Sequence, residues 1–297
     1  MADLLLHDSL SRPAGGHAPF GAHRLPAWRE AIRSLGAGLV PRAYPRLASI
    51  VSWPIWRLSL IGRPSPVDLE PYPGFRLRLY PRENHADTKC YARPGLVDLA
   101  EEAAMARCAA TSPDDQFILV DAGANTGTYT VLAACLARQV GRTGRFVCIE
   151  ANPKTQRRLA ANLRFSGLDA QADLVPCAVS DTGGAVLLAR SAWNLGSVSV
   201  SDGSGKKRGG LTQVRARTLL SIVEESRLPR IDLLKIDIEG HEVQALGPFL
   251  RTAPAHLLPR MILAETKHDR DSTLASLIIQ AGYRITHHGR SDTVFER

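Results

Sequence analysis

The sequence is poor in cysteine, and its few cysteines form no recognisable pattern. They are Cys90, Cys108, Cys135, Cys148 and Cys177. No two have the spacing of a zinc site, and the odd number argues against a disulfide framework of the kind that small secreted proteins use. We therefore expect reduced, buried thiols and a cytoplasmic protein.

Long apolar runs are also missing. No stretch approaches the roughly 20 residues that a membrane-spanning helix needs. The first eight residues, M-A-D-L-L-L-H-D, lack the basic start and the longer apolar stretch of a secretory signal. The sequence therefore predicts neither a membrane span nor a signal peptide.

Aromatic residues make up only 6% of a chain in which 44% of the residues are hydrophobic. The apolar content comes largely from alanine and leucine, which favours an α/β protein over a β-sandwich. With 297 residues, the chain is long enough to bury a full core as one large domain or two small ones.

Lysine is absent from the first 86 residues, which contain eleven arginines and six acidic residues. This part therefore carries a net charge of +5, and the other 211 residues hold only +3 of the total of +8. Because the larger part is almost neutral and has no stripe of basic and aromatic residues, we expect no nucleic-acid partner.

Composition divides the chain into three parts. Residues 1–25 are rich in glycine, proline and histidine and are predicted to be disordered. Residues 26–86 form a basic extension with an N-terminal helix and a strand over 75–80, and residues 87–297 form the main domain. Within the extension, residues 39–63 mix tryptophan with arginine. This segment either contacts an anionic membrane surface or packs against the main domain.

Strands and helices alternate from residue 117 onward, which predicts a doubly wound α/β sheet of mostly parallel strands with helices on both faces. Strands are expected over 117–122, 145–150, 173–179, 231–237 and 260–265, and helices over 96–110, 127–140, 154–166, 241–251 and 271–281. An insertion with weaker strands over 185–189, 196–200 and 213–217 contains a loop over 201–210 that we expect to be mobile. Residues 283–296 are predicted to form a C-terminal β-hairpin.

The most informative motif is V-D-A-G-A-N-T-G at residues 120–127, where an apolar strand breaks into small residues before a helix. Glycines at positions 123 and 127 let the backbone bend and let a ligand approach. The N–H groups at such a helix start often hold a pyrophosphate. Asp121 would repel phosphate and attract a cation or a hydroxyl, so the motif favours S-adenosylmethionine over a dinucleotide.

A single acid follows the second predicted strand. Glu150 ends that strand, 23 residues after Gly127. In doubly wound folds an acid at this place binds the hydroxyl pair of a cofactor ribose. Asn152, close behind it, is expected to cap the helix that starts at Pro153.

A second constellation lies in I-D-L-L-K-I-D-I-E-G-H-E, residues 231–242. Strand alternation would place Lys235, Asp237 and Glu239 on one face, at the carboxyl end of the fourth strand, where ligands bind in open sheets. Glu265 ends the fifth strand and would point into the same cleft. These acids could orient a substrate hydroxyl, act as a general base or hold a divalent cation, or they could form an ion pair and a helix cap.

Four segments together resemble the FkbM-type family of S-adenosylmethionine-dependent methyltransferases. They are D-A-G-A-N-T-G, F-V-C-I-E-A-N-P, C-A-V-S-D and L-L-K-I-D-I-E-G-H-E. The resemblance runs from about residue 87 to 290. It implies a class I methyltransferase sheet with a Rossmann-like arrangement and methyl transfer to an oxygen of a sugar, glycan or polyketide-type acceptor.

The resemblance also implies which residues contact the cofactor. They are Asp121 and Gly123 at the methionine part, Asn125 and Gly127 in the turn, Glu150 at the ribose, and Ser180 and Asp181 beside the adenine.

The transfer site would be lined by Asp237 and Glu239, with His241 as a further candidate base because the pKa of histidine lies near neutral pH. Lys235 and Glu265 would face the acceptor. The resemblance indicates no metal, although the acids leave a divalent cation possible.

Two other functions stay open at this stage. One is a non-catalytic protein that only binds S-adenosylmethionine or a partner. The other, less favoured, is a nicotinamide-dependent oxidoreductase, which would need G-x-G-x-x-G where this chain has G-x-x-x-G.

Overall fold

The structure, a computed structural model, describes residues 18–38, 54–63, 65–92, 99–190, 198–201, 211–267, 269, 271–289 and 291–297. Three predictions therefore fall wholly or mainly outside the described residues. They are the disordered N-terminus over 1–25, the basic and aromatic segment over 39–63, and the mobile loop over 201–210. The division of the chain at residues 25 and 86 stays a prediction.

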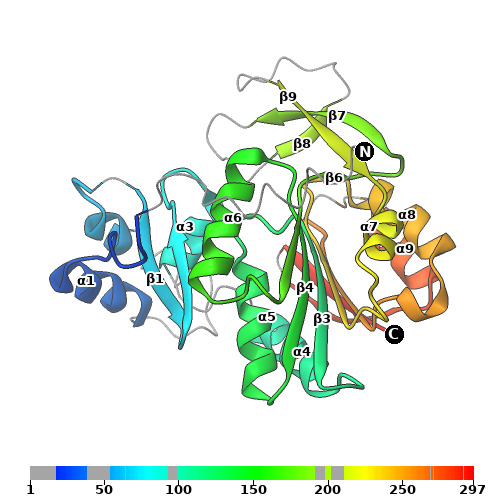
Figure 1. Ribbon diagram of the computed structural model, residues 1–297, viewed down its shortest axis with the longest axis horizontal. Coiled ribbons are helices and arrows are strands. Elements are labelled where there is room, and N and C mark those ends of the chain that lie inside the picture. Colours follow the sequence, from blue (N-terminus) through cyan, green and yellow to red (C-terminus); the bar gives the residue numbers. More distant parts are fainter. Residues whose placement is uncertain are drawn as a thin grey trace.

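A seven-stranded sheet forms the centre of the molecule (Figure 1). In spatial order its strands are β12 (Arg284–His288), β13 (Asp292–Glu296), β11 (Met261–Glu265), β10 (Leu233–Ile236), β3 (Gln116–Ala122), β4 (Thr143–Ile149) and β5 (Ala172–Val175). Strands β11, β10, β3, β4 and β5 are parallel, and β13 is antiparallel to both of its neighbours. The predicted α/β fold, with a mostly parallel sheet and a C-terminal hairpin, is confirmed. Chain order reverses between β3 and β10, which is the switch point at which such sheets bind ligands.

Helices cover both faces of this sheet (Figure 1), as predicted. The helices α4 (Leu99–Ala110), α5 (Thr128–Gln139) and α6 (Pro153–Phe165) lie on one face, and α7 (Leu219–Glu225), α8 (Glu242–Thr252) and α9 (Thr273–Gln280) lie on the other. Along β3, Phe117 and Leu119 belong to the first core, whereas Ile118 and Val120 belong to the second. Because both faces are covered, the inner strands are apolar almost throughout rather than alternating.

The predicted third strand, 173–179, was wrong as a single element. The chain leaves the central sheet after β5, and Pro176 separates it from β6 (Ala178–Val179). Strand β6 belongs to a second sheet of order β6-β9-β7-β8, built with the insertion strands β7 (Gly184–Arg190), β8 (Val198–Ser201) and β9 (Leu211–Arg217). The weaker strands predicted for the insertion are thus confirmed, although the sequence did not show that they form a sheet of their own.

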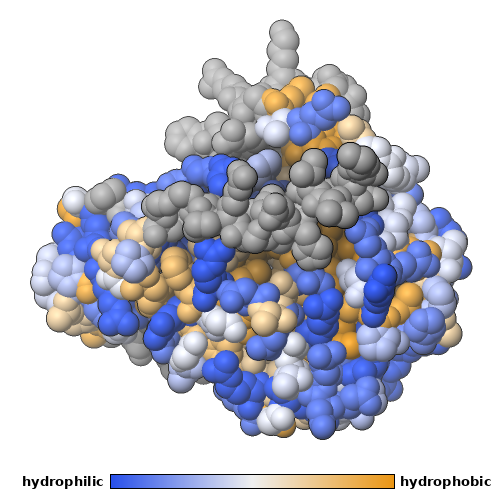
Figure 2. Space-filling model, in the orientation of Figure 1, coloured by the Kyte–Doolittle hydropathy of each residue, from blue (hydrophilic) through white to orange (hydrophobic). Residues whose placement is uncertain are grey.

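This second sheet lies at the upper end of the molecule, near the carboxyl ends of β3 and β4 (Figure 1). Apolar colour shows over β7 and β9 in Figure 2. Leu187 and Leu211, on these two strands, are both exposed.

The part of the chain before residue 93 contains α1 (Ala27–Gly38), the hairpin β1 (Val67–Tyr72) and β2 (Phe75–Leu79), and α3 (His85–Ala92). The prediction of α1 and of a strand over 75–80 is confirmed, whereas β1 and α3 were not predicted. A buried ion pair joins the hairpin strands, with Arg78 Nε 2.7 Å from Asp68 Oδ1. The hairpin is bound to α6, since Arg78 N donates to Asn162 Oδ1 at 2.7 Å. None of the described helices is long and apolar enough to cross a membrane.

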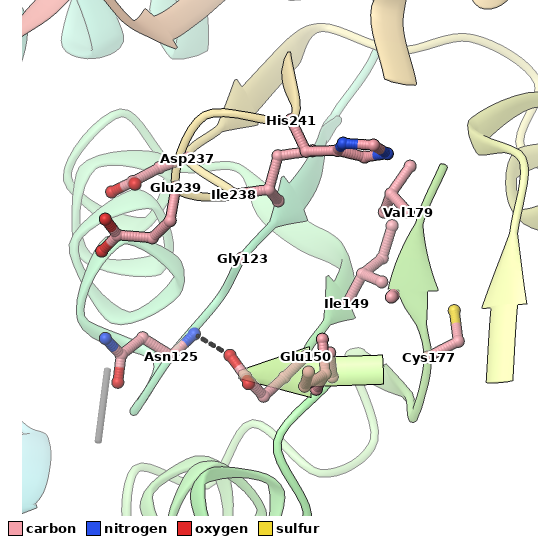
Figure 3. Close-up of a pocket in the computed structure, with 13 residues that line it drawn as sticks. Gly123, Asn125, Ile149, Glu150, Cys177, Val179, Asp237, Ile238, Glu239 and His241 are labelled. Carbon is pink, nitrogen blue, oxygen red and sulfur yellow. Dashed lines mark hydrogen bonds between the residues drawn. The ribbon is translucent and has the colours of Figure 1, made fainter. Parts of the chain in front are cut away.

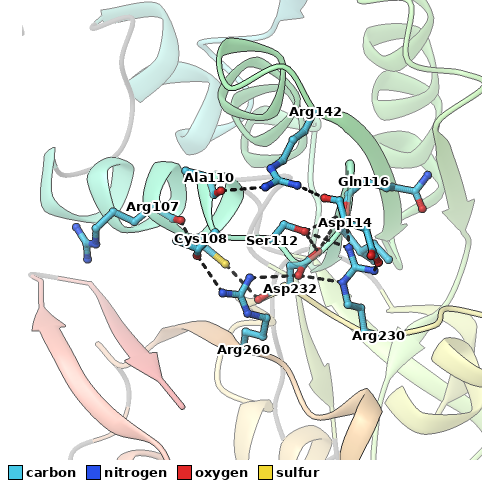
Figure 4. Close-up of polar contacts among 12 residues, drawn as sticks. Arg107, Cys108, Ala110, Ser112, Asp114, Gln116, Arg142, Arg230, Asp232 and Arg260 are labelled. Carbon is cyan, nitrogen blue, oxygen red and sulfur yellow. Dashed lines mark hydrogen bonds and ion pairs between the residues drawn. The ribbon is translucent and has the colours of Figure 1, made fainter.

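At the opposite end of the sheet, where the parallel strands begin, one buried acid contacts residues from several loops (Figure 4). Asp232 accepts hydrogen bonds from Ile118 N at 2.9 Å and from Ser112 Oγ at 3.1 Å. Arg230 and Arg260 contact its other oxygen at 3.2 and 3.4 Å. This carboxylate therefore stabilises the end of the sheet that lies away from the switch point.

All five cysteines are free and buried, as predicted. Burial raises the pKa of each thiol, to about 11 for Cys177 and about 12 for Cys108. Such thiols are packing groups rather than nucleophiles.

Candidate active site

The glycine-rich turn after β3 is in close contact with the loop after β10. Gly123 has φ 81°, and a Cβ atom placed on it would lie 1.9 Å from the carbonyl oxygen of Asp237. On the other side, the N–H groups of Gly123 and Ala124 donate to Ile149 O at 2.9 and 3.0 Å. The turn is therefore held between the ends of β4 and β10, and only glycine fits at this position.

A pocket opens at this turn, between the carboxyl ends of the central strands and the second sheet (Figure 3). Its lining residues are Gly123, Asn125, Ile149, Glu150, Ala151, Cys177, Ala178, Val179, Leu188, Asp237, Ile238, Glu239 and His241. The empty space is about 620 Å³, including the part that is open to solvent.

Glu150 lies on the floor of the pocket with both carboxylate oxygens held by backbone groups. Asn125 N donates to Oε2 at 2.9 Å (Figure 3), and Asn152 N donates to Oε1 at 2.7 Å. Burial raises the pKa of Glu150 to about 7, although both hydrogen bonds favour the ionised form. As predicted, Asn152 also caps α6, accepting from Lys154 N at 3.0 Å.

The pocket chemistry fits a ligand that contains adenosine and no pyrophosphate. Glu150 provides oxygens that could accept from a hydroxyl pair, and Ile149, Val179 and Ile238 provide apolar surface for a base. Among the described residues that line the pocket there is no lysine or arginine that would bind a pyrophosphate.

Asp121 does not line this pocket, because it is fully buried behind the turn. Its Oδ2 accepts from Thr130 Oγ1 at 2.7 Å, and its Oδ1 lies 3.9 Å from Lys235 Nζ. Lys235 is also buried, lies 3.4 Å from Asp237 Oδ2 and donates to Gly123 O at 3.4 Å. Burial alone would lower the pKa of Lys235, but Asp237 and Asp121 raise it, so the ammonium group stays charged.

Asp237 and Glu239 project to the same side of the pocket mouth (Figure 3). Strand alternation was the wrong reason for this arrangement, because β10 ends at Ile236 and Glu239 has a left-handed φ of 58°. Lys267 lies 3.8 Å from Glu239 Oε2 and forms a tight ion pair with Glu265 Oε1. The site thus contains two lysines that neutralise part of a larger group of acids.

The acids of this group differ in protonation. Burial alone would raise the pKa of Asp237, but the charges of Lys235 and Lys267 lower it. Burial and the charge of Asp237 raise the pKa of Glu265 to about 8. Of this pair, Asp237 therefore has the lower pKa and is the more readily ionised.

His241 lines the pocket on the side away from Asp237 and Glu239 (Figure 3). Its Nε2 lies 3.1 Å from Ser180 Oγ, and this hydroxyl also donates to Asp181 Oδ1 at 3.1 Å. Burial lowers the pKa of His241, so its ring is neutral at pH 7.

Among the described residues, one group has the spacing of a cation site. One oxygen from each of Asp237, Glu242 and Glu265 lies within 4.8 Å of the others. However, Glu242 Oε1 already accepts from Ile238 N and Gly240 N at 2.8 and 3.2 Å. The ammonium groups of Lys235 and Lys267 contact the other two acids, so this donor set does not fit a resident divalent cation well.

The predicted site residues thus fall into two groups. Gly123, Asn125, Glu150, Asp237, Glu239 and His241 line the pocket, whereas Asp121, Gly127, Ser180, Asp181, Lys235 and Glu265 do not. The apolar lining from Cys177 and Leu188 was not foreseen, because nothing in a buried strand marks it as facing a ligand.

Comparison with known proteins identifies one matching family. The Methyltransferase FkbM domain matches residues 121–285. No curated protein matches the sequence.

Solved structures of several methyltransferases are similar to the chain at low identity. Methyltransferase FkbM from Methylobacillus flagellatus KT shares 18% identity with a TM-score of 0.45, and the match covers 90% of this chain and 58% of that one. The O-methyltransferase from Bacillus cereus, in complex with SAH, shares 12% identity with a TM-score of 0.38, covering 68% and 82%. Aeropyrum pernix fibrillarin, with natively bound S-adenosyl-L-methionine, shares 14% identity with a TM-score of 0.36, covering 65% and 73%. The chain thus spans little more than half the length of the first of these structures.

Proposed function

Because this chain belongs to the FkbM family of methyltransferases, we propose that it transfers the methyl group of S-adenosylmethionine to a hydroxyl oxygen of a sugar, glycan or polyketide-type acceptor. The proposal rests on the position of Asp237 in the pocket lining. This acid lines the same pocket as Glu150, and its pKa is lower than that of the neighbouring Glu265.

S-adenosylmethionine, when bound, supplies an electrophilic methyl group on a positively charged sulfur. Glu150 would accept hydrogen bonds from the ribose hydroxyls, and Ile149 and Val179 would pack against the base. The negative charges of Asp237 and Glu239 at the mouth would favour binding of the donor, with its positively charged sulfur, over binding of the product, which lacks that charge.

Asp237 is proposed as the general base. Transfer of the methyl group from the donor sulfur to the acceptor oxygen would release the hydroxyl proton, and Asp237 would accept it. Lys235, 3.4 Å from Asp237 Oδ2, keeps this carboxylate ionised. General-base help of this kind typically contributes about 10²–10⁴ to the rate, and positioning contributes the larger share.

The charge pattern also supports a neutral, hydroxyl-rich acceptor. Lys235 and Lys267 lie near the site, but both are paired with acids. They would have to give up these partners to bind a phosphate or carboxylate group on the acceptor. The half-buried carboxylates of Asp237 and Glu239 at the mouth instead suit hydroxyl donors.

Two measurements test the proposal. Calorimetry with S-adenosylhomocysteine (SAH) should show binding to the wild-type protein, and release of SAH from S-adenosylmethionine should be measured over a panel of sugars, glycans and polyketide alcohols. We expect Asp237→Asn to retain SAH binding and to lose about 10²–10⁴ in turnover. Glu224→Gln, on the exposed side of α7, is the matched control for loss of one charge and should leave both unchanged.

Two outcomes would count against the proposal. Absence of SAH binding by the wild type would refute a methyl-donor site. Full turnover by Asp237→Asn would leave the methyltransferase in place but refute the assignment of the base.

A further inference from the structure

The turn that forms the cofactor pocket is held from outside by residues far upstream in the chain. Asn84 Nδ2 donates to Asn125 Oδ1 at 2.6 Å. Asp87 Oδ1 accepts from the hydroxyl of Thr126 at 2.5 Å. Both upstream residues lie outside residues 121–285, which match the family.

Asn125 has a left-handed backbone, with φ 52°. Its backbone N–H donates to Glu150 Oε2 on the pocket floor, and its side chain accepts from Asn84 on the other side. The contact from Asn84 therefore supports the conformation in which the N–H of Asn125 reaches Glu150. Asparagine tolerates this conformation better than most residues, yet it still needs support from its surroundings.

Thr126 is fully buried and forms hydrogen bonds through both its hydroxyl group and its carbonyl oxygen. Its hydroxyl donates to Asp87, and its carbonyl oxygen accepts from Asn162 Nδ2 of α6 at 2.8 Å. The second oxygen of Asp87 accepts from Tyr80 N at 2.8 Å, directly after β2. Asp87 is also fully buried, so neither of these bonds competes with water.

The upstream residues are themselves fixed by helix capping. Asn84 Oδ1 accepts from Ala86 N at 2.9 Å and from Asp87 N at 3.4 Å, so Asn84 caps the start of α3. One side chain therefore begins a helix with its oxygen and holds the pocket turn with its nitrogen. The spacing N-x-x-D is the signal that the sequence carries for this arrangement.

We propose that Asn84 and Asp87 are positioning residues for the cofactor, which hold the turn of the methyl-donor site through Asn125 and Thr126. The inference rests on the proposed function in one respect, since it takes the pocket at Asn125 and Glu150 to be where the donor binds. Neither side chain lines that pocket. Both act through the turn, by holding it in the bound shape before the ligand arrives.

The main test separates the two roles of the Asn84 side chain, whose oxygen caps α3 and whose nitrogen holds Asn125. Asn84→Ser retains an N-cap for α3 but is too short to reach Asn125. We expect this variant to raise the Kd for SAH about fivefold, the factor expected from one neutral hydrogen bond. Asn84→Asp retains the cap and offers an oxygen to which a rotated Asn125 amide can donate, so its Kd should stay within about twofold of the wild type.

Glu83→Gln is the matched control from the same loop. Glu83 contacts Lys154 at 2.9 Å and Arg158 at 2.5 Å on α6 and does not contact the turn. Its Kd for SAH should equal that of the wild type, whatever the change in its Tm. Calorimetry should be run well below the Tm of every variant, so that a loss of stability alone does not change the Kd.

Thr126 provides the test for Asp87. Thr126→Ser retains the hydroxyl donor, whereas Thr126→Val removes it at nearly constant shape. We expect valine, and not serine, to raise the Kd for SAH about fivefold or more. If the valine variant does not fold, the Asn84 variants still test whether contacts from outside the pocket affect SAH binding.

The possible outcomes are distinct. A wild-type Kd for SAH together with a lowered Tm in Asn84→Ser would mean that the contact is merely structural, and would overturn the inference. An equal rise in Kd for Glu83→Gln would overturn it as well, because the effect would then belong to the loop in general. If the wild-type protein does not bind SAH at all, the proposed function fails first.

Discussion

Replacing Gly123 by alanine is the most direct test of how the pocket is built. The added Cβ would lie 1.9 Å from the carbonyl oxygen of Asp237 and 2.9 Å from its carbonyl carbon. Real Cβ atoms do not approach other atoms closer than 3.0 Å. Because the obstructing atoms belong to the backbone, either the turn or the loop after β10 must move by about 1 Å.

Two costs add up in this variant. A left-handed φ costs an L-residue about 1–2 kcal/mol, and overpacking against a backbone that must shift costs about 1–3 kcal/mol more. Gly141→Ala separates them, since Gly141 has φ 73° and nothing within 4 Å of its added Cβ. Gly141→Ala therefore has the cost of a left-handed φ without the cost of overpacking.

We expect Gly123→Ala to melt about 2–12 °C below Gly141→Ala, taking about 2–4 °C per kcal/mol for the second cost alone. The Kd for SAH should rise at least tenfold in Gly123→Ala, because the turn and the Asp237 loop both line the pocket. In Gly141→Ala, at the end of α5, the Kd should not change. Scanning calorimetry and SAH titration measure the two effects.

The reasoning is refuted if Gly123→Ala binds SAH with the wild-type Kd and melts together with Gly141→Ala. The close approach of the two loops would then not be required for the pocket. A lowered Tm with an unchanged Kd would refute only the link between this contact and the ligand.

Three further predictions concern other parts of the molecule. Asp232→Ala should lower the free energy of unfolding by about 3–5 kcal/mol, because it leaves buried donors and charges unpaired, and it should not change the Kd for SAH, since it lies at the opposite edge of the sheet. Denaturant unfolding and calorimetry check both parts. Burial raises the pKa of Glu150 to about 7, so the carboxylate that would accept from the ribose forms between pH 6 and 8. SAH affinity should therefore rise up to about tenfold over that range, and Glu150→Gln should remove this dependence. The five buried cysteines should not react with a thiol reagent in the native protein, and all five should react in denaturant; rapid reaction of the folded protein would contradict their burial.

Much of the central sheet could be predicted from local patterns. The strand predicted over 117–122 is observed at Gln116–Ala122, and that over 260–265 at Met261–Glu265. The motif at residues 120–127 and the acid at 150 also lie where the pattern predicts, at neighbouring strand ends. Runs of apolar residues and helix signals depend on positions a few residues apart, which the sequence displays directly.

Which sheet a strand joins is not a local property. The segment predicted as one strand over 173–179 divides because Ala178 pairs with Ala216 of β9, not with the central sheet. Likewise, α3 lacks an apolar stripe, and its place is set by contacts of Asn84 and Asp87 with the distant turn. Long-range pairing of this kind leaves little trace in the nearby sequence.

The sequence by itself determined the family of the protein, the turn and the strand ends at which a ligand would bind. Only the tertiary structure decided which charged residues face the pocket. Asp121 pairs with Thr130 and lies beside Lys235 behind the turn, whereas Asp237 reaches the pocket mouth. A buried charge must be compensated by whichever group the fold brings near it, and strands far apart in the chain supply those groups.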